Sequence, residues 1–215
     1  MSKPIKQTIY TIVFAMTCII TVPALVKAII LMFKHIYMYW WFLGGGVLYL
    51  IASMLIFKKN MSFLQTLSHE SLHMVACLMM FRKVESLKAT AANGGVVYHY
   101  GDSNMFISLA PYTMPIITLL LLLIQQFIPA RFMAFWIVVG FTFFFYLHSF
   151  LTQAKPYQTD LKNHGLIPSY LYIISLASFN IAICLLAVDM KLFKALGFYF
   201  TDIWNTISGI SGSLV

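Results

Sequence analysis

Long apolar stretches recur along the whole chain and constrain its fold more than any other feature. A transmembrane helix needs roughly 20 mostly apolar residues. The chain has 215 residues, of which 61% are apolar and only 9% are charged, whereas an ordinary soluble domain is about half apolar and about a quarter charged. We therefore expect an all-α polytopic membrane protein with about six transmembrane helices. The candidate spans are residues 9–33, 36–57, 62–81, 105–128, 130–151 and 168–188.

Two further segments have sequence patterns that predict structures other than a transmembrane helix. Residues 84–102 combine the turn signal Asn93-Gly94-Gly95 with a run of strand-forming residues, which predicts a small β-hairpin at the membrane edge. After Asp189, apolar residues recur at helical spacing with polar residues between them, which predicts a C-terminal amphipathic helix in the membrane interface. We expect a single transmembrane domain over residues 1–188 and an interfacial tail over residues 189–215.

The positive charges border the apolar stretches. The formal net charge is +8, and Lys and Arg beside membrane spans meet lipid headgroups and bias membrane orientation. We therefore expect the lipid bilayer as a partner and no nucleic acid. With six spans, seven positive residues fall on the side of the N-terminus and six on the other. This difference is too small to set the orientation.

The third apolar stretch contains three ionisable residues, His69, Glu70 and His73, within five positions. Residues four apart share one face of a helix, so both imidazoles can reach a single metal ion. Zinc suits two neutral imidazoles with an oxygen ligand and an open position for water, and Glu70 can act on that water as a general base. An ionisable side chain in the membrane costs about 2.5–3.5 kcal/mol on insertion scales. The alternative is a buried polar patch in which Glu70 bonds to a histidine.

A zinc site of this kind needs a third protein ligand. Asp160 lies in the polar connection after the fifth apolar stretch, and His148 lies one turn before the end of that stretch. Both remain candidates from spacing alone, with Asp160 first and His148 second.

The chain resembles the site-2 protease group of intramembrane zinc metalloproteases, peptidase family M50. The resemblance runs from about residue 62 to residue 167 and has four parts. They are His69-Glu70-x-x-His73 in an apolar helix, a β-prone loop with Gly94-Gly95, the run Ser108-Leu109-Ala110-Pro111-Tyr112, and Gln158-Thr159-Asp160. Many members have Gly where this chain has Leu72, and many carry Asn-Pro or Asp-Gly around the aspartate. We expect no PDZ domain, so the chain resembles a small, divergent member.

The resemblance implies an intramembrane zinc metalloprotease with its catalytic core at about residues 62–167. It implies one Zn²⁺ per chain, held by His69, His73 and Asp160, with Glu70 as the catalytic base. The substrate would be a membrane-anchored protein or peptide. His148 and Asn163 are candidates to hold the oxyanion or to orient Asp160, although His148 is equally consistent with a buried histidine bonded to a backbone carbonyl.

The resemblance also implies a role for the β-prone loop. An edge strand containing Val96, Val97 and Tyr98 would pair with an unwound stretch of substrate and present its backbone to the metal. The alternative is a hairpin that only plugs the site.

Two other functions remain open alongside the protease. One is a non-catalytic M50-like membrane subunit that binds a partner protein within a complex. The other is a transporter or channel component, which is weakly supported because the other apolar stretches contain almost no ionisable residues. We expect an integral membrane protein of a bacterial cytoplasmic membrane. The family pattern implies that the zinc site and hairpin open toward the cytosol, which with six spans would place both termini outside.

Overall fold

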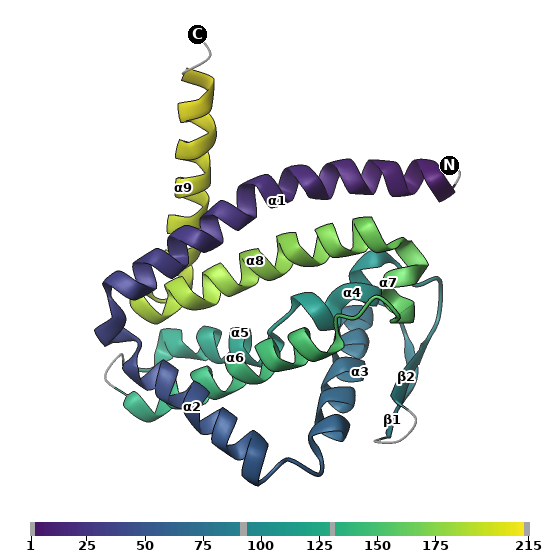
Figure 1. Ribbon diagram of the computed structural model, residues 1–215, viewed down its shortest axis with the longest axis horizontal. Coiled ribbons are helices and arrows are strands. Elements are labelled where there is room, and N and C mark those ends of the chain that lie inside the picture. The colour runs from purple at the N-terminus through teal and green to yellow at the C-terminus, as the bar shows by residue number, and fades with distance from the viewer. Residues whose placement is uncertain (1–2, 91–93, 130–131, 213–215) are drawn as a thin grey trace.

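The computed structural model describes residues 3–90, 94–129 and 132–212, most of which are helical (Figure 1). The helices in chain order are α1 (Lys3–Lys34), η1 (Ile36–Met38), α2 (Trp40–Leu55), α3 (Met61–Met79), α4 (Met105–Thr113), α5 (Ile116–Ile124), η2 (Gln125–Phe127), α6 (Met133–Gln153), α7 (Thr159–His164), α8 (Leu166–Met190) and α9 (Leu192–Gly212). Two strands, β1 (Val84–Thr90) and β2 (Gly94–His99), lie between α3 and α4.

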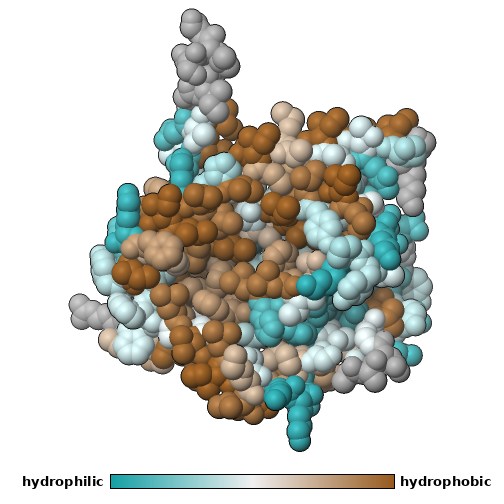
Figure 2. Space-filling view, in the orientation of Figure 1, coloured by the Kyte–Doolittle hydropathy of each residue, from teal (hydrophilic) through white to brown (hydrophobic). Residues whose placement is uncertain are grey.

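Helices α1 and α8 run side by side in the same direction (Figure 1). Phe14 meets Tyr172 in their first halves, with ring centroids 4.9 Å apart. At their other ends, Nδ1 of His35 lies 2.7 Å from Oδ2 of Asp189. More than half of the side chains of α8 are buried. Apolar residues cover much of the face shown in Figure 2, as expected for a surface in contact with lipid.

The described residues contain three helices that are long and apolar enough to cross a membrane, namely Pro4–Lys34, Met133–Gln153 and Leu166–Met190. A fourth span results if the bent pair Met105–Thr113 and Ile116–Phe127 counts as one. The predicted count of about six spans is therefore not confirmed, although a helix lies at each predicted place.

Helices α2 and α3 were predicted as spans but are not among the candidate membrane spans of the described residues. Helix α2 has 16 residues, which gives a length of about 24 Å, against a hydrocarbon core of about 30 Å. Helix α3 has 19 residues, but His69, Glu70 and His73 interrupt its apolar character.

Helix α2 packs directly on the backbone of α6 through glycines. A Cβ atom added to Gly45 would lie 2.0 Å from the carbonyl oxygen of Ile137. A Cβ atom added to Gly140 would lie 1.9 Å from the carbonyl oxygen of Phe42. Small residues allow this close approach of two helix backbones. The contact fixes α6, whose last residue, Gln153, reaches the candidate site described below.

The predicted span at residues 105–128 is bent by 71° between α4 and α5. Proline at position 115 has no backbone N–H, and its ring disfavours a helical conformation at the preceding residue. Met114 accordingly has extended backbone angles, φ −110° and ψ 105°. The break separates a buried α4 from the apolar α5. It also places Tyr112 beside α7, which carries Asp160.

The predicted hairpin is confirmed by β1 and β2, which pair antiparallel. In this pairing Leu87 lies opposite Val97, and Lys88 lies opposite Val96. Asn93, part of the predicted turn, lies outside the described residues. Gly94, also part of that turn signal, has φ +73°, a conformation that glycine adopts without steric cost.

The C-terminal tail forms the long helix α9, as the spacing predicts. In Figure 1 it leaves the end of α8 and projects from the rest of the molecule. Leu192, Ala195 and Tyr199 are buried, and large apolar side chains such as Phe200 and Trp204 are exposed. The location of α9 in the membrane interface and the domain division at residues 188–189 stay predictions.

Candidate metal centre

Helix α3 places His69 and His73 on one face, one turn apart. Their ring centroids are 4.8 Å apart, as the four-residue spacing requires. His69 and Glu70 are buried. The polar face of α3 is turned toward α4, the hairpin and the end of α6 rather than toward lipid. This placement shelters the ionisable groups within the protein.

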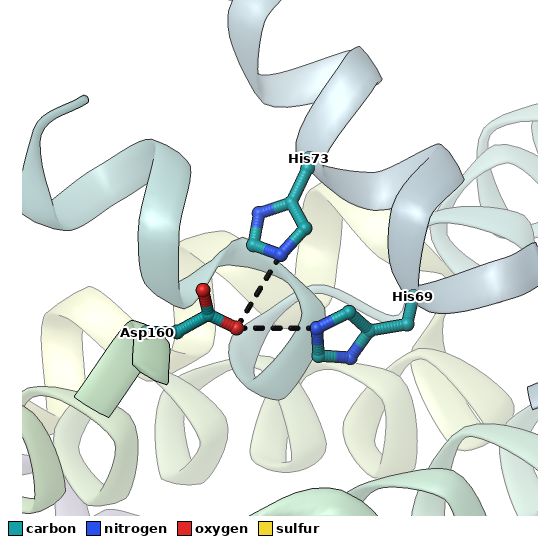
Figure 3. Close-up of side chains that lie close together, drawn as sticks. All are labelled: His69, His73 and Asp160. Carbon is teal, nitrogen blue, oxygen red and sulfur yellow. Dashed lines mark hydrogen bonds and ion pairs between the residues drawn. The ribbon is translucent and has the colours of Figure 1, made fainter. Parts of the chain in front are cut away.

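Asp160 approaches the two histidines from α7, 87 residues beyond His73 in the sequence. Its Oδ2 lies 3.3 Å from Nε2 of His69 and 3.5 Å from Nε2 of His73. Figure 3 shows both imidazoles directed at this one carboxylate oxygen. The sequence left Asp160 and His148 as candidates for this position, and the structure brings Asp160 to it.

The far side of each imidazole is held by an oxygen acceptor. Nδ1 of His69 lies 3.2 Å from Oε1 of Gln153, and Nδ1 of His73 lies 2.8 Å from the carbonyl oxygen of Ile107. Because these oxygens only accept, each Nδ1 carries a hydrogen. Each Nε2 then either donates a proton to Asp160 from an imidazolium or offers a lone pair to a cation.

The three groups fit a zinc ion. Their ligand atoms all lie within 4.8 Å of one another. A tetrahedral zinc with bonds of about 2.0–2.1 Å has its ligand atoms about 3.3 Å apart, close to the distances from Asp160 to the two histidines. Two imidazoles with bonded Nδ1–H groups and one carboxylate form a typical set for catalytic zinc.

Asp160 is suited to be the anionic ligand. Burial raises the pKa of its carboxyl, but hydrogen bonds and positive charge from His69 and His73 outweigh burial, and the pKa lies well below its ordinary value. The carboxylate is therefore ionised at neutral pH.

Glu70 lines one cavity of about 440 Å³ together with His69, His73 and Asp160. The hairpin forms another wall of this cavity through Gly95, Val96 and Val97. A Cβ atom added to Gly95 would lie 2.3 Å from Cγ of Glu70, so β2 passes directly over the Glu70 side chain. The cavity thus brings together the Glu70 carboxyl group, a cluster that could hold a metal ion and an extended strand.

The other predicted site residues divide into two groups. Asn163 lines the cavity. His148 is not among its described lining residues, because its Nδ1 bonds to the hydroxyl of Tyr49 on α2. Tyr98 is half exposed on β2 and is likewise not among the described lining residues.

Two residues at the centre were not predicted from the sequence. Gln153 bonds to His69 from the end of α6. The hydroxyl of Tyr112 lies 3.2 Å from Oδ2 of Asp160. Tyr112 belongs to the run Ser108–Tyr112 that carries part of the family resemblance, but that run assigned no role to its side chain, and nothing in the sequence distinguished Gln153 from other polar residues at the end of an apolar helix.

Comparison with known proteins decides the family. The sequence matches the Peptidase M50B-like family over residues 47–159, slightly more than half of the chain. The chain belongs to this family. The matched region contains the histidine pair, the hairpin and α4 to α6, and it ends one residue before Asp160. The predicted resemblance to the M50 group is confirmed.

Membership of this family supports a protease-related function. M50 peptidases are generally zinc-dependent, in agreement with the chemistry of the three ligand residues. Together with the apolar helices, the family identifies an integral membrane protein. No curated protein matches the chain, and no solved structure matches it either.

Proposed function

We propose that the protein is an intramembrane zinc metalloprotease that hydrolyses peptide bonds of a membrane-anchored protein or peptide. The observation that carries this proposal is the convergence of His69, His73 and Asp160 on one point, with Glu70 in the same cavity. Each chain would bind one Zn²⁺ through these three residues. When bound, the ion would polarise a peptide carbonyl and acidify water at its open position.

The residues of the chain perform the remaining steps. Glu70 takes a proton from the attacking water while the water oxygen bonds to the carbonyl carbon. Glu70 then donates this proton to the departing nitrogen as the carbon–nitrogen bond breaks, which leaves a carboxylic acid and an amine. Asn163 lines the cavity and is a candidate to donate a hydrogen bond to the carbonyl oxygen as negative charge develops there.

The wall formed by β2 supports a role in substrate binding. A helical substrate has its backbone amides bonded internally, so it must unwind before its peptide bond reaches the base. β2 pairs with β1 along one edge, and its residues Gly94 to Val97 line the cavity. An extended substrate segment would pair with the other edge of β2 and lie across the cluster.

The replacement Glu70→Gln tests the proposed function. Gln keeps the size of the side chain but cannot accept the proton, so a loss of about 10²–10⁴-fold in rate is expected. Glu85→Gln is the matched control, because Glu85 is exposed on β1. Protein termini in membranes from expressing cells would be mapped by mass spectrometry.

The proposal predicts new termini within apolar segments for the wild type and Glu85→Gln but not for Glu70→Gln. Identical termini for all three proteins would contradict it. If a biological effect of the protein survives Glu70→Gln, the function is that of a non-catalytic subunit that binds a partner.

We further propose that the protein resides in a bacterial cytoplasmic membrane with its zinc site open to the cytosol. The family pattern supports this orientation. The expected location of both termini outside depended on six spans, and it does not follow from the three or four spans that the structure supports.

A further inference from the structure

Asp160 lies on an element that provides little rigidity of its own. Helix α7 has six residues and is followed by Gly165, which has φ +91°. Pro156 lies in the loop before it. A single isolated turn of this length is unstable by itself, so contacts with the rest of the molecule must hold the Asp160 side chain in place.

Tyr112 provides such a contact to Oδ2 of Asp160. Its hydroxyl lies 3.2 Å from Oδ2 of Asp160, the same oxygen that faces both imidazoles. A carboxylate oxygen only accepts, so the phenol donates. The ring of Tyr112 also meets the His69 imidazole edge-on, with centroids 5.2 Å apart. One side chain therefore contacts ligand residues from two different elements.

The backbone around Tyr112 is itself fixed. Tyr112 is fully buried. The hydroxyl of Tyr146 donates to the carbonyl oxygen of Tyr112 across 3.2 Å. Nδ2 of Asn180 donates to the carbonyl oxygen of Thr113 across 2.8 Å. Near the break before α5, carbonyl groups lack helical partners, and these two bonds from α6 and α8 occupy them.

Packing alone would explain a large aromatic residue here. Tyr112 belongs to a buried cluster with Met105, Leu109, Leu161 and Tyr172. Phenylalanine would fill the same space, however, and a buried phenol is favourable only when its hydroxyl has a partner. The hydrogen bond to Asp160 supplies that partner.

We propose that Tyr112 is a positioning residue, whose hydroxyl holds Oδ2 of Asp160 where it faces both Nε2 of His69 and Nε2 of His73. This inference rests on the proposed zinc site. Groups that hydrogen-bond to metal ligands contribute to affinity, and their loss typically weakens metal binding about 10–100-fold.

The test is the zinc affinity of the full-length Tyr112→Phe variant, measured in detergent by competition with a chelator. We expect about 10–100-fold weaker binding than wild type, while the metal-free variant remains folded. Tyr170→Phe is the matched control and should bind zinc as wild type does, because its hydroxyl bonds to the carbonyl oxygen of Ala154 instead.

Equal zinc affinity of Tyr112→Phe and wild type would overturn the inference and leave the proposed function intact. Loss of the metal-free fold in Tyr112→Phe would also overturn it, because the hydroxyl would then act on the fold rather than on Asp160. Failure of the wild type to bind zinc would instead refute the proposed function.

Discussion

The side chain of Gln153 connects the end of α6 to the first histidine of α3, with Oε1 of Gln153 3.2 Å from Nδ1 of His69. This contact fixes the hydrogen on Nδ1 and leaves Nε2 to face His73 and Asp160. It also links the candidate metal centre to the α2–α6 packing, because Gln153 is the last residue of α6.

Replacing Gln153 with Leu should weaken zinc binding about 10–100-fold, because the His69 imidazole loses the group that orients it. Gln65→Leu is the matched control. Gln65 lies one turn before His69 but bonds to Thr152 instead. Chelator competition on the purified variants provides the measurement, and equal losses for both variants would exclude a specific role for Gln153.

Gly95→Ala should lower the cleavage rate and leave the zinc content unchanged. The new methyl group would meet Cγ of Glu70 at 2.3 Å, so the base must move, and a displacement of about 1 Å can cost about 10²-fold in rate. Val96→Ala in the same strand is the control. Cleavage rate and zinc content would be measured together. Unchanged cleavage by Gly95→Ala would show that the hairpin does not determine the position of Glu70.

Proline in β2 tests substrate pairing. In an antiparallel strand, successive residues direct their N–H groups to opposite edges, so one of Val96 and Val97 directs its N–H away from β1. Val97→Pro should reduce turnover while zinc stays bound. Val96→Pro removes an N–H group from the opposite edge, so its turnover should differ from that of Val97→Pro. If both variants retain full turnover, the hairpin only covers the site.

The glycines of α2 provide a stability test. Gly45→Ala places a methyl group 2.0 Å from the carbonyl oxygen of Ile137, and such overpacking costs about 1–3 kcal/mol. Gly44→Ala is the control, because no atom lies within 4 Å of its added Cβ. Thermal unfolding in detergent should show a lower midpoint for Gly45→Ala alone. Equal midpoints would contradict the close packing of α2 on α6.

The histidine pair and the hairpin were predictable because both depend on local sequence. His69 and His73 lie one helical turn apart, and this relationship holds wherever α3 lies in the molecule. Gly94-Gly95 marks the turn directly. The choice of Asp160 over His148 was less certain, because it depends on how distant segments pack rather than on spacing.

Other features depended on tertiary contacts that one sequence does not reveal. His148 bonds to Tyr49, a residue 99 positions away. The composition of residues 105–128 favoured a single span, and the bend at Pro115 was not predicted. Helix α7 has only six residues, too few for a periodic pattern to be recognised. Tyr112 and Gln153 became identifiable only when the break and the end of α6 placed them beside Asp160 and His69.

The proposed zinc site is tested by the zinc content of the detergent-purified protein, measured by elemental mass spectrometry beside His73→Ala. Removal of one of three ligands should abolish stable binding, whereas the wild type should contain about one zinc per chain. That result would show that a metal organises His69, His73 and Asp160. A well-folded wild-type protein without zinc, or equal zinc in both proteins, would contradict the proposed zinc site.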